Sequence, residues 1–485
     1  MRVILINLFT PFTGSIYTSG LVHLEPLGLE YIGAAAMEAG HDVRIISPYK
    51  NENLEVFAER IITESPDVIG IGPATYNFNQ AKTLSRIIKV RQRKTFIVFG
   101  GYHISAVPEE VADPVIDLAI IGEGEYTFVE VLERLKKGLD YEDVGGISFL
   151  KNDRIIVNPR RERIHDLDKL PYPLRNKNEM TAYRCRGIYN PPAGQQSSVA
   201  QVAYSRGCPF RCSYCSSHNM WGNSVAYRDA GMVADEIQYL MDNFGTNLIF
   251  FSDLTFNLNR RKVIELCETI IRRNIKISWF CGCRPEGMDD ALIGMMKEAG
   301  CTRIHYGIES IDEYSLRKIH RKKTFSFLEG ALECTSRAGI ITRGYLMIGY
   351  PWETAEQYET IPLILNKLSI DELRLSYFTP FPGTSSYNEF KEIIETNNWE
   401  CYTTDRPIIR LKDLEEEDLL KIRDKIFIEF YNNQDYIKRV IAKIAAFPEL
   451  HDSFLEFFEE MELKECLDTL RKLFIDYKWK MHYKP

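Results

Sequence analysis

The chain has 485 residues, of which 45% are hydrophobic and 26% are charged, an ordinary composition for a globular protein of about three domains. Its 60 Lys and Arg residues against 68 Asp and Glu residues give a net charge of −8, which argues against a surface built mainly to bind nucleic acid. No apolar run approaches about 18 residues, so we expect no membrane span, and the short apolar start predicts a strand and not a signal peptide.

Residues 1–145 alternate short apolar runs with amphipathic stretches, a pattern typical of a Rossmann-like α/β domain. The apolar runs predict five strands, at 3–8, 43–46, 68–72, 96–99 and 118–121. The stretches that follow them predict four helices, at 29–39, 54–64, 80–91 and 127–137. A parallel sheet of this kind binds ligands beyond the carboxyl ends of its strands.

The loops at these strand ends are rich in glycine. Gly100-Gly101-Tyr102-His103 follows the fourth strand, and Gly122-Glu123-Gly124-Glu125 follows the fifth. Other loops, at 10–14 and 73–77, follow the first and third strands. Each loop taken alone is equally compatible with an ordinary turn, but together they meet at one edge, where glycine lets a ligand approach the backbone. We therefore expect a flat or extended ligand, and not a dinucleotide, because no G-x-G-x-x-G follows the first strand.

The rest of the chain divides into three further segments. Residues 146–198 are rich in proline turns and predict an ordered connector. Residues 199–395 predict a partial (β/α)6 barrel of the TIM type, whose active site lies at the carboxyl ends of its strands. Its strands are expected at 201–205, 248–252, 275–280, 303–308, 344–348 and 374–378. Residues 396–485 predict a helical C-terminal region that packs on or caps the barrel.

Cysteine spacing is the most specific feature of the sequence. The chain has 11 cysteines, none before Cys185, and three of them cluster at Cys208, Cys212 and Cys215. The odd number and uneven spacing argue against a disulfide framework and favour a reducing, cytoplasmic compartment. Structural zinc needs four ligands, and His218 is the available fourth, but the spacing is unlike that of a zinc finger. Three thiolates suit a [4Fe–4S] cluster that keeps one iron open.

Cys208-x-x-x-Cys212-x-Tyr214-Cys215 resembles the C-x-x-x-C-x-Φ-C motif of radical S-adenosylmethionine (SAM) enzymes, with Tyr214 at the aromatic position. The resemblance implies that the open iron binds SAM and that reductive cleavage of SAM yields a 5′-deoxyadenosyl radical. It also implies that Tyr214 packs near the adenine. An electron donor of the flavodoxin or ferredoxin type would supply the electron.

The same resemblance assigns further SAM contacts to residues at the ends of the barrel strands. Ser252 and Asp253 correspond to contacts with the methionine amino group, and Arg284 to a carboxylate contact, although a surface ion pair is equally compatible with Arg284. The ribose and adenine contacts fall on a last set of positions: Glu309, Ser310 and Gly349.

The N-terminal segment is similar to that of the cobalamin-binding subclass of these enzymes, in Pro26-Leu27-Gly28-Leu29, in both glycine loops and in Asp166-Leu167-Asp168-Lys169-Leu170-Pro171. The similarity implies that cobalamin contacts come from the strand-end loops: Thr75, Tyr76, Gly100, Gly101, Tyr102, His103, Gly122, Glu123 and Gly124. The D-x-H-x-x-G signature of a cobalt-binding histidine is absent, because Gly101 and Ala106 stand at its first and last positions. We therefore predict that His103 bonds within its loop, and that Tyr76 is the candidate beneath the cobalt.

Together the resemblances imply a cobalamin-dependent radical SAM enzyme that methylates an unactivated carbon of a small natural-product intermediate, through methylcobalamin and a 5′-deoxyadenosyl radical. Two alternatives remain open at this point. The same architecture serves cyclisation, ring contraction or dehydration, with cobalamin repurposed or lost. A metal-stabilised binding protein without catalytic activity is the other alternative, and it requires a closed set of four metal ligands.

Overall fold

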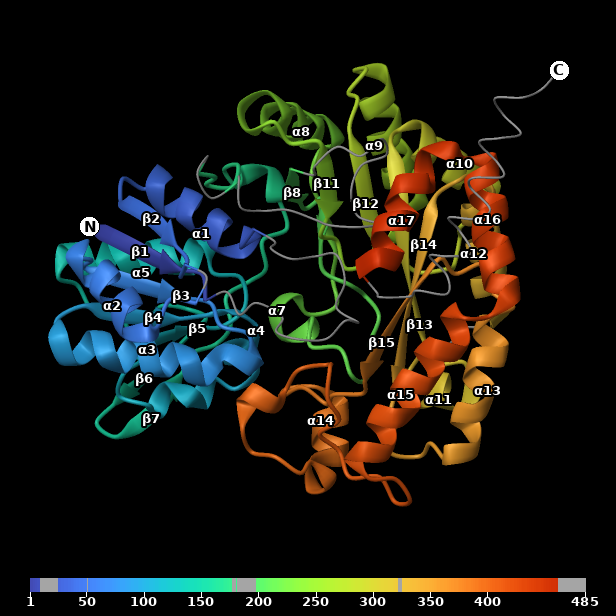
Figure 1. Cartoon of the computed structure of the whole chain (residues 1–485). Helices are drawn as coiled ribbons and strands as arrows, with labels where there is room; N and C mark the ends of the chain where they lie inside the picture. Colours follow the sequence, from blue (N-terminus) through green and yellow to red (C-terminus); the bar gives the residue numbers. More distant parts are fainter. Residues whose placement is uncertain (9–24, 50, 177–179, 181–197, 322–324, 461–485) are drawn as a thin grey trace.

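The computed structural model describes residues 1–8, 25–49, 51–176, 180, 198–321 and 325–460 (Figure 1). The loop predicted at 10–14, Cys185, Cys466 and the last part of the predicted helical tail lie outside the described residues. Figure 1 shows two α/β units side by side, an N-terminal one and a larger one that carries the C-terminal helices. None of the described helices is long and apolar enough to cross a membrane.

The N-terminal unit is a seven-stranded sheet with the strand order β2-β1-β3-β4-β5-β6-β7. Its first five strands are parallel, as predicted: β1 (Arg2–Ile6), β2 (Asp42–Ile46), β3 (Val68–Ile71), β4 (Phe96–Phe99) and β5 (Leu118–Ile120). Helices cover both faces of the sheet: α1 (Leu27–Glu38) and α5 (Glu125–Lys137) on one face, α2 (Leu54–Thr63) and α3 (Phe78–Arg91) on the other. The short helix α4 (Gly101–Ala106) follows β4 directly.

The sheet continues beyond residue 145, where the sequence predicted a connector. A hairpin of β6 (Ile147–Lys151) and β7 (Arg154–Val157) adds two antiparallel strands next to β5. Asn152 and Asp153, which form its two-residue turn, both have positive φ, and these residue types tolerate that conformation best among non-glycine residues. The hairpin hydrogen bonds to β5 and buries Ile147 and Phe149 in the core of this unit, so the connector begins only after Val157.

The second unit is an open parallel barrel of six strands, in the order β15-β14-β13-β12-β11-β8, and the predicted partial barrel is confirmed. The strands are β8 (Val199–Val202), β11 (Leu248–Phe251), β12 (Ser278–Cys283), β13 (Cys301–Glu309), β14 (Ile341–Ile348) and β15 (Glu372–Tyr377). The helices outside them are α8 (Ala230–Phe244), α9 (Arg260–Arg272), α10 (Asp290–Glu298), α11 (Glu313–Lys318), α12 (Phe325–Arg337) and α13 (Ala355–Leu365).

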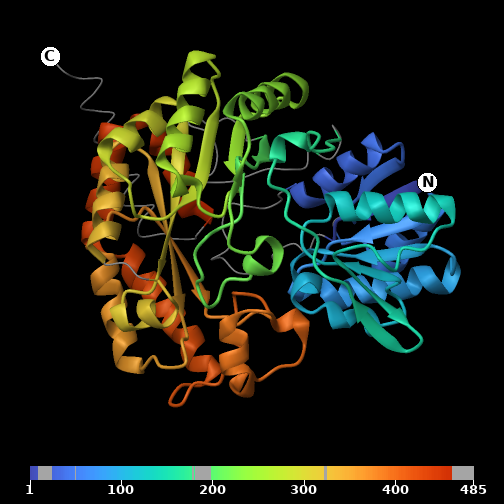
Figure 2. The same ribbon diagram turned by 180° about the vertical axis from the view of Figure 1, so that it is seen from behind.

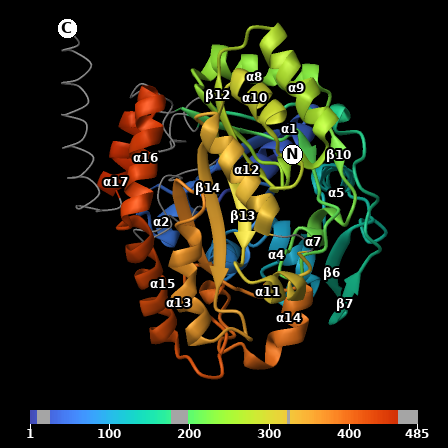
Figure 3. The same ribbon diagram turned by 90° about the vertical axis from the view of Figure 1, so that its right-hand side faces the viewer.

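The barrel does not close, so β8 and β15 present open edges that other segments cover. At β15, the hydroxyl group of Tyr431 accepts a hydrogen bond from the Leu373 N–H at 2.8 Å. Tyr431 belongs to the C-terminal helices α15 (Glu416–Tyr431), α16 (Gln434–Ala446) and α17 (His451–Glu460), which lie along the barrel in Figure 3. Their buried side chains join the core of the barrel, so the described part of this region packs on the barrel and has no core of its own.

The β8 edge faces the N-terminal unit, and a buried polar network joins the two units there. Glu25 accepts a hydrogen bond from the Gln201 N–H of β8 at 2.5 Å. Arg175, from the connector, bonds to Glu25 and to Glu236 of α8, and all three side chains are almost fully buried. Figure 2 shows the same junction from behind, with the short helix α7 (His218–Trp221) between the two units.

Candidate active site

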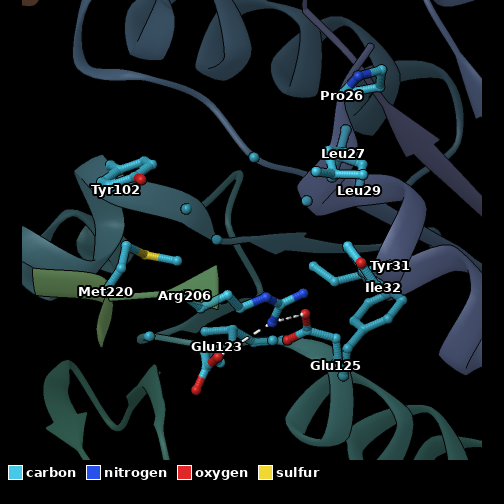
Figure 4. A pocket seen from close by; sticks show the side chains of 18 of the residues that line it. Pro26, Leu27, Leu29, Tyr31, Ile32, Tyr102, Glu123, Glu125, Arg206 and Met220 are labelled. Atoms are coloured by element: carbon cyan, nitrogen blue, oxygen red, sulfur yellow. Dashed lines mark hydrogen bonds and ion pairs between the residues drawn. The ribbon is translucent and has the colours of Figure 1, made fainter. Parts of the chain in front are cut away.

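A cavity of about 560 Å³ lies where the two units meet, beyond the carboxyl ends of the N-terminal strands (Figure 4). One wall comes from the start of α1 and from the loops after β3, β4 and β5. The other wall comes from β8, β11 and the residues around the short strand β9 (Ser205–Arg206). Most lining side chains are apolar, and Leu27, Leu29 and Ile32 of α1 face this space together with Met220 of α7.

Six of the nine predicted cobalamin residues line this cavity: Gly100, Gly101, Tyr102, Gly122, Glu123 and Gly124. Gly101 and Gly122 have φ values of +84° and +82°, a conformation that side chains disfavour, and a Cβ on either would lie about 3.5 Å from the nearest backbone. Backbone without side chains therefore forms part of the wall, as the sequence predicted. A large, mainly apolar cavity of this kind fits an extended ligand such as a corrinoid.

Thr75, Tyr76 and His103, by contrast, are not among the residues that line this cavity. His103 Nδ1 lies 3.2 Å from Thr75 Oγ1, and its ring packs against Phe78 with 4.1 Å between ring centroids. The reason is the helix α4, whose turn directs Tyr102 to the cavity and His103, the next residue, away from it. Burial lowers the pKa of His103 to about 4, so it is neutral. Its side-chain partner belongs to the loop after β3 and not to its own loop, so the prediction of a bond within the loop is wrong.

The cysteine motif begins directly at the cavity wall. Strand β9 pairs with β10 (Ala226–Tyr227), and Gly207, which follows β9 and lines the cavity, is the residue before Cys208. Asp253 fixes this turn, because its carboxylate accepts hydrogen bonds from the Tyr204 N–H at 3.0 Å and the Ser205 hydroxyl at 2.5 Å. Burial raises the pKa of Asp253 to about 6. Asp253 thus supports the loop from behind, whereas its neighbour Ser252 lines the cavity itself.

The three cysteines lie within electrostatic range of one another. Burial raises the pKa of the Cys215 thiol, and the charges of Cys212 and Cys208 raise it further. Among the described residues, no three His, Cys, Asp or Glu side chains converge as a single metal ion requires. A cube of four irons separates its thiolate ligands more widely, because each binds a different iron atom, so one loop with three thiols fits such a cluster. His218 Nε2 lies 2.6 Å from the Phe210 carbonyl oxygen, and this contact ties the loop together.

A second polar group lies beside the cysteine loop, at the carboxyl end of β13. Glu309 has φ +64°, an unusual backbone conformation for this residue type, and its carboxylate pairs with Arg321 at 3.4 Å. Burial raises the pKa of Tyr214 and the nearby charge of Glu309 raises it further, whereas Arg321 lowers it. The nearby charge of Cys212 is one of those that raise the pKa of Arg321. Cys212, Tyr214 and Glu309 therefore lie within electrostatic range of one another, and their role as cluster ligand and SAM contacts stays a prediction.

The other predicted SAM residues lie nearby but already have protein partners. The Arg284 guanidinium stacks on the Phe210 ring at 3.8 Å and pairs with Glu286 at 3.2 Å. The Gly349 N–H donates to Glu353 at 2.9 Å, and its φ of +83° favours glycine. Ser310 is buried, and its hydroxyl accepts a hydrogen bond from the Asp312 N–H at 3.1 Å.

Sequence reasoning missed several residues of the site because their partners are remote in the chain. Arg206 lines the cavity and pairs with Glu123 and Glu125 of the N-terminal unit, and Arg321 holds Glu309. The available signal for Arg206 was its position immediately before Gly207-Cys208, between a predicted strand and the motif. Cys281 and Cys283, whose sulfur atoms lie 3.6 Å apart, are buried core residues that do not line the cavity.

Comparison with known proteins identifies the two units. A family described as "B12 binding domain" matches residues 18–132, and the radical SAM superfamily matches residues 202–362. An uncharacterised methyltransferase of Pyrococcus horikoshii is 32% identical over 441 residues, which cover 89% of this chain and 93% of the relative. The chain belongs to the cobalamin-dependent radical SAM family. It is therefore an enzyme of a methyltransferase family, and its cofactors are a [4Fe–4S] cluster, SAM and cobalamin.

Two further similarities extend over most of this radical SAM enzyme. The anaerobic magnesium-protoporphyrin IX monomethyl ester cyclase of Rubrivivax gelatinosus is 26% identical over 428 residues, 86% of this chain and 76% of the relative. The radical SAM methyltransferase TsrM of Kitasatospora setae, solved with cobalamin and a [4Fe–4S] cluster bound, has a TM-score of 0.68 at 16% identity. That match covers 97% of this chain and 99% of TsrM. The predicted fold class, a Rossmann-like cobalamin-binding domain followed by a radical SAM barrel, is thus confirmed.

Proposed function

We propose that this enzyme transfers a methyl group to an unactivated carbon of a small natural-product intermediate, bound where the cavity meets the cysteine loop. The observation that carries this proposal is the position of Gly207, which lines the cavity and directly precedes Cys208. A ligand in the cavity and a cluster on the loop are thereby neighbours, as methyl transfer by two cofactors requires. The cofactors, when bound, supply the methyl group and the radical that removes hydrogen from the substrate.

In this proposal, the residues of this chain bind the cofactors and orient them. Cys208, Cys212 and Cys215 hold the cluster, and the glycine loops with Tyr102 and Glu123 hold cobalamin. Tyr214, Glu309 and Ser310 hold the nucleoside part of SAM, since a carboxylate or a hydroxyl bonds well to ribose hydroxyl groups. Ser252, Asp253, Arg284 and Gly349 complete this site, Asp253 by supporting the loop and Arg284 through its stacking on Phe210.

The experiment uses protein reconstituted without oxygen, incubated with SAM and a strong reductant. The wild type should form 5′-deoxyadenosine, and Cys212→Ala should reduce that rate at least about a thousandfold, because removal of a cluster ligand removes the reductive step. Cys334→Ala is the matched control, since Cys334 lies on α12, remote from the motif in sequence, and should keep wild-type activity. Deoxyadenosine formation at the wild-type rate by Cys212→Ala would exclude the cluster assignment.

A different radical outcome is the second candidate, and the cyclase of Rubrivivax gelatinosus is the observation that favours it. SAM labelled on its methyl group distinguishes the two. Methylation releases S-adenosylhomocysteine besides deoxyadenosine and methionine, and it transfers the label to the product. Cyclisation or dehydration releases deoxyadenosine and labelled methionine without S-adenosylhomocysteine, and it leaves the product unlabelled. We further propose a flavodoxin- or ferredoxin-type donor for the electron, to be tested by replacing the chemical reductant with each protein in turn.

A further inference from the structure

Arg206 lines the cavity, pairs with carboxylates of the N-terminal unit and lies two residues before Cys208. Its guanidinium Nη1 lies 2.6 Å from Glu125 Oε1 and 3.2 Å from Glu123 Oε1, and both carboxylates come from the N-terminal unit (Figure 4). The guanidinium also lies over the ring of Tyr31 on α1, 4.6 Å from its centroid. Only 10% of the Arg206 side chain is exposed, so this pairing takes place out of bulk water.

The charge of Arg206 is well compensated in this position. Burial alone would lower the pKa of its guanidinium, but the charges of Glu125, Tyr31 and Glu123 outweigh it and raise that pKa. Removal of the guanidinium would therefore leave Glu125 without its cation beside the cavity, and it would leave Glu123 with Arg163, whose Nε lies 3.6 Å from Glu123 Oε2. Such an unpaired buried charge costs far more than the loss of an exposed ion pair.

The backbone of Arg206 is fixed as firmly as its side chain. Arg206 pairs with Ala226 across the β9–β10 ribbon, and its carbonyl oxygen accepts a hydrogen bond from Arg163 at 3.1 Å. Gly207 follows with φ +100°, and a Cβ there would lie 2.1 Å from the Ser224 carbonyl oxygen. Cys208 is the next residue, so a displacement of Arg206 is transmitted to the first cysteine through two tightly held peptide units.

Tyr102 is a second side chain that joins the cavity to the segment after the cysteines, because it lines the cavity and packs on Trp221 of α7. It lines the cavity from α4, and its ring packs edge-on against Trp221 with 5.7 Å between centroids. Tyr102 is 38% exposed, and it is exposed where it lines the cavity. Burial raises the pKa of Tyr102, the charge of Cys215 raises it further and the charge of Arg206 lowers it. Tyr102 therefore lies within electrostatic range of both Cys215 and Arg206.

We propose that Arg206 is a positioning residue that links the two cofactor sites, so that the Arg206–Glu123–Glu125 pairing sets both the shape of the cobalamin cavity and the placement of the cluster. The inference rests on the proposed function only in that cobalamin occupies the cavity and the cluster occupies the cysteine loop. It applies equally to a methylating enzyme and to a cyclase, because no step of the transfer reaction enters the argument.

Two readouts test the link without any measurement of methyl transfer. The first is the dissociation constant for aquacobalamin, followed by absorbance. The second is the midpoint potential of the cluster, followed by electron paramagnetic resonance in a redox titration. Arg206→Gln should weaken cobalamin binding at least about tenfold. It should also make the cluster potential more negative, since removing a nearby positive charge disfavours the added electron.

The control and companion variants separate this role from general stability. Arg260→Gln removes an exposed arginine that pairs with Asp289 on the outside of the barrel, and it should change neither readout. Arg206→Lys keeps the charge but cannot donate in a planar fork to two carboxylates, so it should give intermediate values and serves if Arg206→Gln does not fold. Glu125→Gln should make the further loss caused by Arg206→Gln smaller, because the pair is already broken.

The outcomes are distinct. Shifts in both cobalamin affinity and cluster potential, in variants whose circular dichroism spectrum matches the wild type, support the link. Wild-type values in both readouts overturn it. A shift in only one of them also overturns it, because Arg206 would then serve one cofactor and not connect the two. Failure of the methylation assay alone leaves these binding and redox measurements intact, so it bears on the proposed function and not on this inference.

Discussion

Gly207 is the position at which a single methyl group should disturb the cysteine loop most. Alanine there must adopt φ +100° and bring its Cβ to 2.1 Å from the Ser224 carbonyl oxygen, whereas real Cβ contacts stay beyond about 3.0 Å. The carbonyl cannot retreat easily, because Arg163 donates a hydrogen bond to it. Backbone strain of about 1–3 kcal/mol and overpacking of about 1–3 kcal/mol together predict a loss of about 2–6 kcal/mol in unfolding free energy.

Two other glycines serve as controls for this prediction. Gly222 has φ +60° with no atom within 4 Å of its Cβ position, so Gly222→Ala should cost only about 1–2 kcal/mol. Gly300 has φ +98° and a Cβ position 2.0 Å from the Ile277 carbonyl oxygen, but it precedes β13 at the opposite end of the barrel from the cysteines. Gly300→Ala should therefore destabilise the fold as strongly as Gly207→Ala does.

The assay combines urea unfolding under anaerobic conditions with the iron content per folded chain after reconstitution. Gly207→Ala should lose both stability and iron, whereas Gly300→Ala should lose stability and keep its iron. If Gly207→Ala unfolds at the same urea concentration as Gly222→Ala and binds a full complement of iron, the reasoning from its backbone geometry is wrong. Equal iron loss in Gly207→Ala and Gly300→Ala would show a general effect of instability.

Three further predictions concern stability. Burial raises the pKa of Glu353 from 4.5 to about 7, so between these pH values the native state binds more protons than the unfolded state. The unfolding free energy should therefore fall by up to about 3 kcal/mol as the pH rises from 4.5 to 7. Glu353→Gln should remove that slope, and an unchanged pH profile by urea unfolding would contradict it. Arg175→Met leaves Glu25 and Glu236 buried without their shared cation and should cost about 3–5 kcal/mol in the same assay; a loss below about 1 kcal/mol would refute the network. Tyr431→Phe removes the acceptor for the Leu373 N–H and should cost about 1–3 kcal/mol, with faster amide exchange at β15 as the check; unchanged exchange would show that this bond does not protect the strand edge.

Local patterns carried much of the architecture. The five parallel strands of the N-terminal sheet and the six strands of the barrel lie within a few residues of their predicted positions, because each is a short apolar run next to an amphipathic helix. The hairpin around the turn at Asn152–Asp153 was not predicted from local patterns. That pair is a weaker turn signal than Asn-Gly, and the hairpin it joins became visible only through its pairing with β5.

The candidate site divides in the same way. The three cysteines and the glycine loops follow from spacing and residue type, whereas the direction of a side chain within a short helix does not. Tyr102 and His103 are adjacent in one predicted loop, yet α4 turns one to the cavity and the other toward α3. No local pattern distinguishes them, because the start of the helix, and therefore its phase, depends on the packing of α4 between the two units.

By itself, the sequence determined the chemistry available to this protein: three thiols on one loop, glycines at strand ends, and two successive α/β units with enough apolar residues for their cores. Only the tertiary structure decided which charges meet. Arg206 pairs with carboxylates that lie 81 and 83 residues away in the chain, and the edge strand β15 is covered by a tyrosine 58 residues further on. Such contacts arise when folding buries whole elements against each other, and the sequence near either partner carries no record of the other.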